Sequence, residues 1–135
     1  RIGDTPLIIK IGALPEDRLA SVIEACLPFI DGVAAINTVP LSIVDADGNQ
    51  ALPGNGRLKS GVCGAAIAGV ATEMTARLLA IRDRLKATFA VVSVGGVMTE
   101  GDIDHRLAMG ADLVMSATAA MWDPLLASRW KNRQG

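Results

Sequence analysis

Four groups of residues could bind a ligand, and each lies at the end of a strand-like run. They are Lys10, Asn37 with Thr38, the pair Gly95-Gly96, and Ala117 with Thr118. A lysine facing a barrel mouth needs an anionic partner, and an asparagine matches the alternating N–H and C=O edge of a pyrimidine. Adjacent glycines let a phosphate approach backbone N–H groups. The set therefore predicts a site for a phosphate and a polar ring.

Each of these residues also has a simpler explanation when it is taken alone. Lys10 could protect a strand edge from aggregation, Asn37 could cap a turn, and Gly95-Gly96 could form only a turn. A binding site is favoured because the residues follow successive strands in order, and ligands bind at the carboxyl ends of strands in βα proteins. A reduced flavin ring, charged near N1, would be a suitable anionic partner for Lys10.

Other chemistry finds little support in the sequence. Cys63 stands between glycines, but the single histidine, His105, is predicted on the solvent face of a helix. A Cys–His catalytic pair is therefore not expected. No spacing of acidic, histidine or cysteine residues predicts a metal site.

Strands that would position the site alternate with predicted helices. Strand-like runs cover 7–11, 32–37, 89–94 and 113–116. Helices are expected from Pro15, over 65–86, from a Thr99/Asp102 capping box to about 109, and from Asp123-Pro124. Residues 38–64 are too long for an ordinary connection, so they predict a binding loop with a small hairpin around 47–49. The alternation predicts an α/β fold with a parallel sheet.

Composition narrows the class of protein. The 135 residues make one domain at most, with 50% hydrophobic and 20% charged residues. A net charge of −1, with 3% aromatic residues and no tyrosine, argues against nucleic-acid binding. Uninterrupted apolar runs stop short of 18 residues and no signal peptide is visible, so no transmembrane segment is expected. Two cysteines make no disulfide framework, and a cytoplasmic location is the expectation.

Several segments in the same order resemble the dihydroorotate dehydrogenase family, and the flavin domain of dihydropyrimidine dehydrogenase is similar. The segments are Ile8-Ile9-Lys10-Ile11-Gly12, 35–39, 60–67, Val94-Gly95-Gly96-Val97 and 110–119. The resemblance implies the C-terminal half, strands five to eight, of a TIM (β/α)8 barrel. Residues 1–135 would then be half of a single FMN-binding domain.

The resemblance also assigns residues to ligands. FMN would be bound by Lys10, Ile36, Cys63, Gly64, Gly95, Gly96, Ala117 and Thr118, and a pyrimidine substrate by Asn37 and Thr38. The chain departs from the family where Ser60-Gly61-Val62-Cys63-Gly64 replaces the usual Gly-Gly-x-Ser/Gly-Gly, and where Ala117 replaces a common glycine.

The activity implied is that of an FMN-dependent dehydrogenase acting on a CH–CH group. It would oxidise dihydroorotate to orotate in pyrimidine biosynthesis, with the catalytic base in the N-terminal half of the barrel; neither Cys26 nor Cys63 matches its position. Open sheet edges predict pairing with that half, in the same or another chain, or a homo-oligomer. The alternatives are a dihydropyrimidine dehydrogenase-like flavoprotein, a non-redox sugar-phosphate isomerase or aldolase with Lys10 as a Schiff base, and a catalytically inactive binding module.

Overall fold

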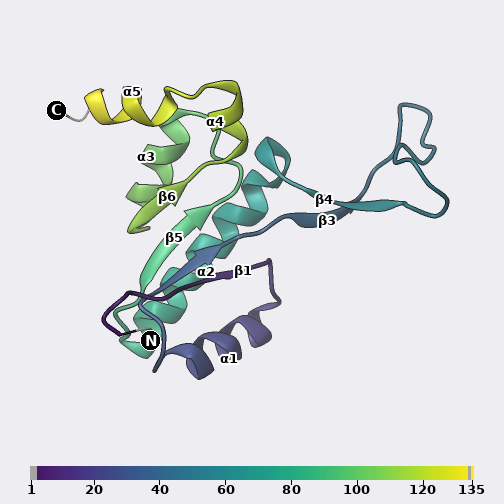
Figure 1. The fold of residues 1–135 in the computed structure, drawn as a ribbon. Coiled ribbons are helices and arrows are strands. Elements are labelled where there is room, and N and C mark those ends of the chain that lie inside the picture. Colours follow the sequence, from purple (N-terminus) through teal and green to yellow (C-terminus); the bar gives the residue numbers. More distant parts are fainter. Residues whose placement is uncertain (1–2, 134) are drawn as a thin grey trace.

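A parallel sheet of four strands organises the chain, and its strands neighbour one another in the order β1-β2-β5-β6. The computed structural model describes residues 3–133 and 135. The sheet strands are β1 (Ile8–Ile11), β2 (Gly32–Ala35), β5 (Ala90–Val94) and β6 (Leu113–Met115). Each neighbouring pair is parallel, as the alternation of strands and helices predicted. Figure 1 shows the helices packed around this sheet.

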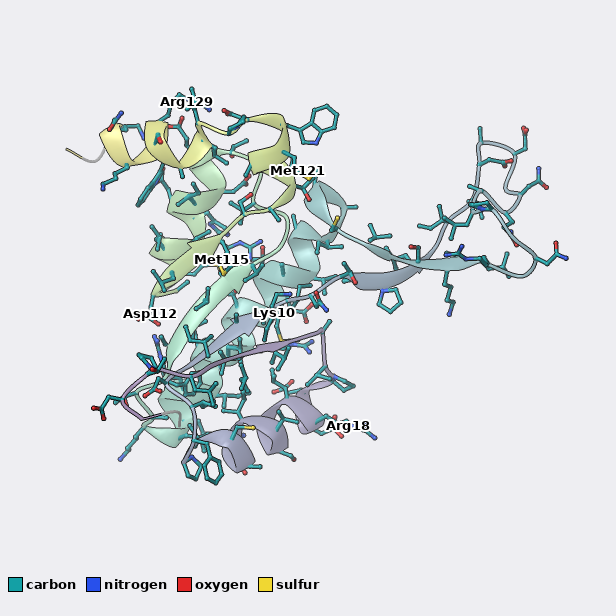
Figure 2. The ribbon with its side chains drawn as sticks, viewed as in Figure 1. Lys10, Arg18, Asp112, Met115, Met121 and Arg129 are labelled. Atoms are coloured by element: carbon teal, nitrogen blue, oxygen red, sulfur yellow. The ribbon has the colours of Figure 1, made fainter. Side chains whose placement is uncertain are left out.

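The core lies between the central strands and two long helices, α1 (Glu16–Cys26) and α2 (Ala68–Leu85). Every residue of β2 is buried, because a central parallel strand has neighbours on both edges and a helical layer over it. The edge strands β1 and β6 are different: Ile8, Leu113 and Met115 are exposed. Figure 2 shows Lys10 and Met115 on these opposite edges. The open edges match the predicted need for further strands.

The segment 38–64 differs from the predicted loop. It forms an antiparallel ribbon of β3 (Val39–Ser42) and β4 (Lys59–Val62), which projects away from the sheet (Figure 1). The predicted small hairpin is present at its tip, where Val44 bridges Gln50 and the Asp45 carboxylate accepts the backbone N–H of Asn49 at 2.8 Å. The ribbon was missed because its strands contain proline, glycine, serine and lysine and lack the mostly apolar runs of the sheet strands.

The long helix predicted over 65–86 begins as a 3₁₀ turn, Gly64–Ile67, and continues as α2. By length and composition alone, Gly64–Leu85 could cross a membrane, which the uninterrupted apolar runs had not indicated. Core helices pass the same test, and this one buries Ala71, Met74 and Leu78 in the core beneath the sheet. Packing within the fold buries 39% of its apolar window.

Helix α3 (Glu100–Ala108) begins with the predicted capping box. The Thr99 hydroxyl accepts the N–H of Asp102 at 3.2 Å, and the Asp102 carboxylate accepts the N–H of Thr99 at 2.8 Å and that of Met98 at 2.9 Å. Burial raises the pKa of Asp102, but these N–H donors and the Thr99 hydroxyl outweigh it and lower the pKa below its usual value. The cap is therefore charged and complete at neutral pH.

Replacing Thr99 by alanine is expected to lower the free energy of unfolding by about 1 kcal/mol, the usual cost of losing an N-cap side chain. Replacing Thr99 by serine keeps a hydroxyl at the N-cap. It should therefore lower the free energy of unfolding by less than about 0.5 kcal/mol. Urea denaturation of both variants measures the difference. Equal stabilities of the alanine and serine variants would show that the hydroxyl contributes nothing.

The C-terminal region contains two short helices where the sequence predicted one. Helix α4 (Thr118–Trp122) was not predicted, and α5 begins at Leu126 and ends at Arg133 rather than opening at Asp123-Pro124. Pro124 lies in the turn between them. The start was misplaced because the proline, a common first helical residue, here stands outside both helices.

Ion pairs hold α5 against α3. Arg129 pairs with Glu100 and with Asp123, and Arg133 pairs with Glu100 and Asp104. The carboxylates of Asp123 and, after it, Glu100 raise the pKa of Arg129. Figure 2 shows Arg129 at this end of the molecule.

Candidate functional site

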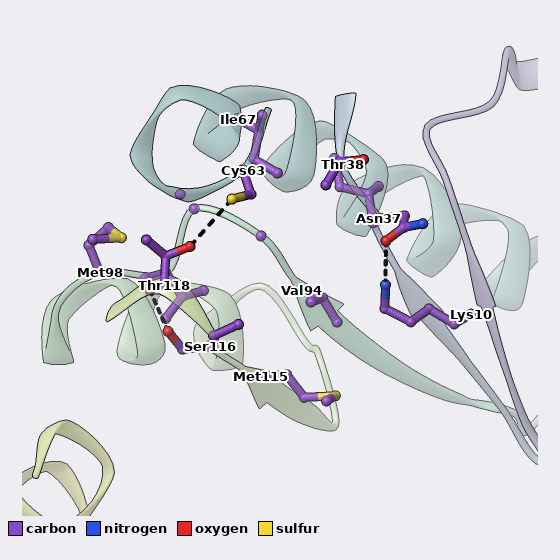
Figure 3. Close-up of a pocket in the computed structure, with 16 residues that line it drawn as sticks. Lys10, Asn37, Thr38, Cys63, Ile67, Val94, Met98, Met115, Ser116 and Thr118 are labelled. Atoms are coloured by element: carbon purple, nitrogen blue, oxygen red, sulfur yellow. Dashed lines mark hydrogen bonds between the residues drawn. The ribbon is translucent and has the colours of Figure 1, made fainter. Parts of the chain in front are cut away.

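A cleft of about 340 Å³ lies at the carboxyl ends of the four sheet strands. Every residue that the sequence predicted to bind cofactor or substrate lines it: Lys10, Ile36, Asn37, Thr38, Cys63, Gly64, Gly95, Gly96, Ala117 and Thr118. Figure 3 shows the polar side chains gathered around this space. The volume lies within the usual range of small-molecule sites. Which ligand atoms each residue contacts stays a prediction.

The polar end of the cleft is formed by Lys10 and Asn37. The Lys10 ammonium donates to Asn37 Oδ1 at 2.8 Å (Figure 3). Both side chains are exposed to the cleft side of the sheet. The backbone N–H of Asn37 donates to the carbonyl of Ile11 at 3.0 Å, and that of Ile36 to Val94 at 2.8 Å. These bonds fix the loop after β2 between its two neighbouring strands.

The β3–β4 ribbon starts and ends at the rim of this cleft. Because Val39 pairs with Val62, Thr38 and Cys63 stand at the base of the ribbon, and both line the cleft. A Cβ on Gly61 would lie 2.9 Å from the Cβ of Thr38. Glycine is therefore required at position 61 by the close approach of Thr38.

Gly95 and Gly96 follow β5, and both have left-handed backbones with φ of 108° and 71°. The structure gives a packing reason for this pair of glycines. A Cβ at Gly96 would lie 2.7 Å from the amide nitrogen of Ala68, and one at Gly95 would lie 3.2 Å from the Cβ of Ala71. The missing side chains make room for helix α2. Close packing of loop and helix is the reason for glycine here.

The opposite wall joins β6 to the end of the ribbon. The Thr118 hydroxyl lies 3.7 Å from the Cys63 sulfur, a weak contact (Figure 3). Ser116 donates to the carbonyl of Val97 at 2.8 Å, which links the loops after β6 and β5. Ala117 precedes the first turn of α4 and provides no side-chain cap. The first N–H groups of a helix have no acceptor within the helix.

Sequence reasoning missed the apolar lining of the cleft and one hydroxyl, which are Ile67, Val94, Val97, Met98, Met115 and Ser116. All but Ile67 lie within two residues of a predicted site residue in the sequence. Of these residues, Met115 is 51% exposed on the edge strand. Their nearness in sequence to the strand ends was the available signal.

Cys26 and His105, which the sequence did not favour as catalytic groups, lie away from the cleft. Cys26 is half-buried on α1 and packs against the core. His105 is exposed on α3, as predicted. Within the described part of the chain, no group of three or more acidic, histidine or cysteine residues could hold a metal ion.

The chain is similar in sequence to curated dihydroorotate dehydrogenases. A curated dihydroorotate dehydrogenase of Dictyostelium discoideum is 34% identical over 131 residues, which are 94% of this chain and 35% of that protein. The quinone-type enzyme of Leifsonia xyli is 31% identical over 89% of this chain and 34% of its own length. No family model matches. The chain is homologous to the dihydroorotate dehydrogenases.

Solved structures agree on the fold. A dihydroorotate dehydrogenase of Eimeria tenella in complex with ferulenol matches with a TM-score of 0.72 and 20% identity, covering 94% of this chain and 32% of that one. The fold of this chain is therefore that of part of a dihydroorotate dehydrogenase TIM barrel. The chain spans about a third of the length of the dihydroorotate dehydrogenases that it matches.

Proposed function

We propose that this chain forms the C-terminal part of the FMN and substrate site of a dihydroorotate dehydrogenase. The observation that carries the proposal is the cleft of about 340 Å³ at the strand ends, which is lined by every residue assigned by the family resemblance. The domain of residues 1–135 would be completed by the remaining strands of the barrel. A dihydropyrimidine would lose a hydride from one carbon and a proton from its neighbour.

The chain's own residues fit an FMN phosphate at the wall opposite Lys10. There the loop of Gly95-Gly96 and the loop of Ala117-Thr118 meet, joined by the Ser116 bond to Val97. Barrels of this type hold phosphates on the loops after their last two strands. The backbone N–H groups of these loops and the Thr118 hydroxyl would donate to the phosphate.

At the other end of the cleft, the Lys10 and Asn37 pair suits a flavin ring and a pyrimidine. Flavin would supply the hydride acceptor of the reaction. Lys10 would place its positive charge beside the reduced ring, and Asn37, whose Oδ1 it holds at 2.8 Å, would be oriented to bind the pyrimidine edge. Thr38 and the backbone of Ile36 lie beside them in the cleft.

The catalytic base is proposed to lie in the part of the barrel outside this chain. Cys63 is the only cysteine in the lining of the cleft, and its contact is the Thr118 hydroxyl. A thiol base would need a position beside the substrate. Cys63 instead lies at the wall assigned to the FMN phosphate and to the ribityl chain that joins the phosphate to the flavin ring. We therefore assign Cys63 and Gly64 to FMN binding.

The proposal is tested by titrating the apo form of the full-length protein with FMN and following flavin fluorescence. Saturable binding is expected, and dihydroorotate should then bleach the flavin absorbance under anaerobic conditions. Absence of flavin binding at saturating FMN would overturn the proposal. Bleaching by dihydrouracil but not dihydroorotate would reassign the substrate to that of a dihydropyrimidine dehydrogenase-like enzyme.

The sugar-phosphate alternative has its own readout. An aldolase with Lys10 as a Schiff base would be trapped on a carbonyl substrate by borohydride, and Lys10 would gain the mass of the substrate less one water plus two hydrogens. We expect no such adduct, because the Lys10 side-chain nitrogen is engaged with Asn37 Oδ1 at 2.8 Å. Intact-mass spectrometry after reduction distinguishes the two chemistries.

A further inference from the structure

Behind the candidate phosphate loop lies a buried arginine that the sequence did not single out. Arg106, on α3, is 2% exposed. Its guanidinium donates to Ser93 Oγ at 2.9 Å, to the carbonyl of Ala68 at 3.0 Å and to the carbonyl of Gly95 at 3.3 Å. One side chain thus connects the end of β5, the start of α2 and helix α3.

The acceptors around Arg106 are all neutral. Ser93 shares a 2.7 Å hydrogen bond with the buried hydroxyl of Thr75, to which Arg106 also donates at 3.5 Å, and the other two partners of Arg106 are backbone carbonyls. Among the described residues, no ion pair to Arg106 is formed. Burial lowers the pKa of Arg106, and Asp102 only partly offsets this. An arginine remains protonated in such a site, so its charge is buried without a carboxylate partner.

The charge lies directly behind the cleft wall. Gly95, whose carbonyl Arg106 binds, lines the cleft, and Ala68 is the residue against which Gly96 is packed. The guanidinium therefore holds the two backbone segments that shape the Gly95-Gly96 loop. A positive charge in this low-dielectric position acts on an anion across the loop more strongly than an exposed charge would.

We propose that Arg106 is a positioning residue that fixes the Gly95-Gly96 loop and favours a phosphate group on its far side. The inference rests on the proposed function, because it concerns the same phosphate. It adds a residue that touches neither cofactor nor substrate. The anion in the cleft would supply the charge compensation that the neutral acceptors around Arg106 do not.

The experiment compares FMN with riboflavin, which lacks the phosphate, in the full-length protein. Arg106→Gln and Arg106→Met remove the charge, and Arg106→Lys retains it. We expect both neutral variants to bind FMN about tenfold more weakly while riboflavin affinity changes less than twofold, as roughly expected for losing a charge near an anion. The lysine variant should recover most of the FMN affinity. Arg84→Met, at an exposed arginine on α2, is the matched control and should change neither affinity.

The outcomes separate the two proposals. If the wild type binds no FMN, the proposed function and this inference both fail. If the wild type binds FMN and the neutral variants weaken FMN and riboflavin by the same factor, Arg106 acts only on folding and the inference alone fails. Should the methionine variant not fold, the glutamine variant, whose amide can still donate to Ser93 and Gly95, decides the result.

Discussion

Replacing Lys10 by methionine in the full-length protein is expected to lower kcat for dihydroorotate oxidation by roughly a hundredfold or more. Removing one charged donor aimed at developing charge in an enclosed site costs about that much. In the proposed site Lys10 is such a donor, and its loss would also release Asn37 Oδ1 from its 2.8 Å hydrogen bond. Steady-state kinetics with saturating FMN measures the effect.

Two further variants decide what Lys10 does. Lys131→Met, at an exposed position on α5, should leave kcat unchanged. Asn37→Ala should raise KM for dihydroorotate more than Lys10→Met does, because the amide is assigned to the substrate and the ammonium to the flavin. An unchanged kcat in Lys10→Met, with FMN fully bound, would contradict its assigned position and support the inactive-module alternative.

Replacing Gly96 by alanine is expected to lower the free energy of unfolding by about 3 kcal/mol, combining overpacking with a left-handed backbone. The new Cβ would lie 2.7 Å from the amide nitrogen of Ala68, and φ at Gly96 is +71°. Backbone atoms cannot rotate away as a side-chain tip can, so the loop or the start of α2 must move. FMN affinity should fall with it. Chemical denaturation and flavin titration measure the two effects.

Gly69→Ala is the matched control for this change. Gly69 lies one residue after Ala68 in α2, and a Cβ there meets no atom within 4 Å. This variant should be as stable as the wild type or more stable by up to about 1 kcal/mol, because alanine favours the helix. If Gly96→Ala is no less stable than Gly69→Ala, the close approach of the loop to α2 is not a constraint.

The sequence predicted the sheet strands well because each is a short, mostly apolar run with turn residues nearby. It also predicted the capping box at Thr99 and Asp102, since that motif depends on neighbours only three residues apart. It failed for the β3–β4 ribbon, whose pairing of Val39 with Val62 spans residues that carry no alternating pattern. It failed again for α4, a short helix whose Ala119 is buried in a small apolar cluster with residues distant in sequence.

From the sequence alone it could be predicted which residues end each strand and in which order the strands follow one another. Parallel strands bring their carboxyl ends to one edge of the sheet. The sequence therefore predicted that Lys10, Asn37 and Gly95 share a cleft. Tertiary structure alone decided why Gly96 is a glycine and where Arg106 lies. Both depend on how closely α2 and α3 approach the end of β5, and such contacts between distant segments leave no periodic signal in the chain.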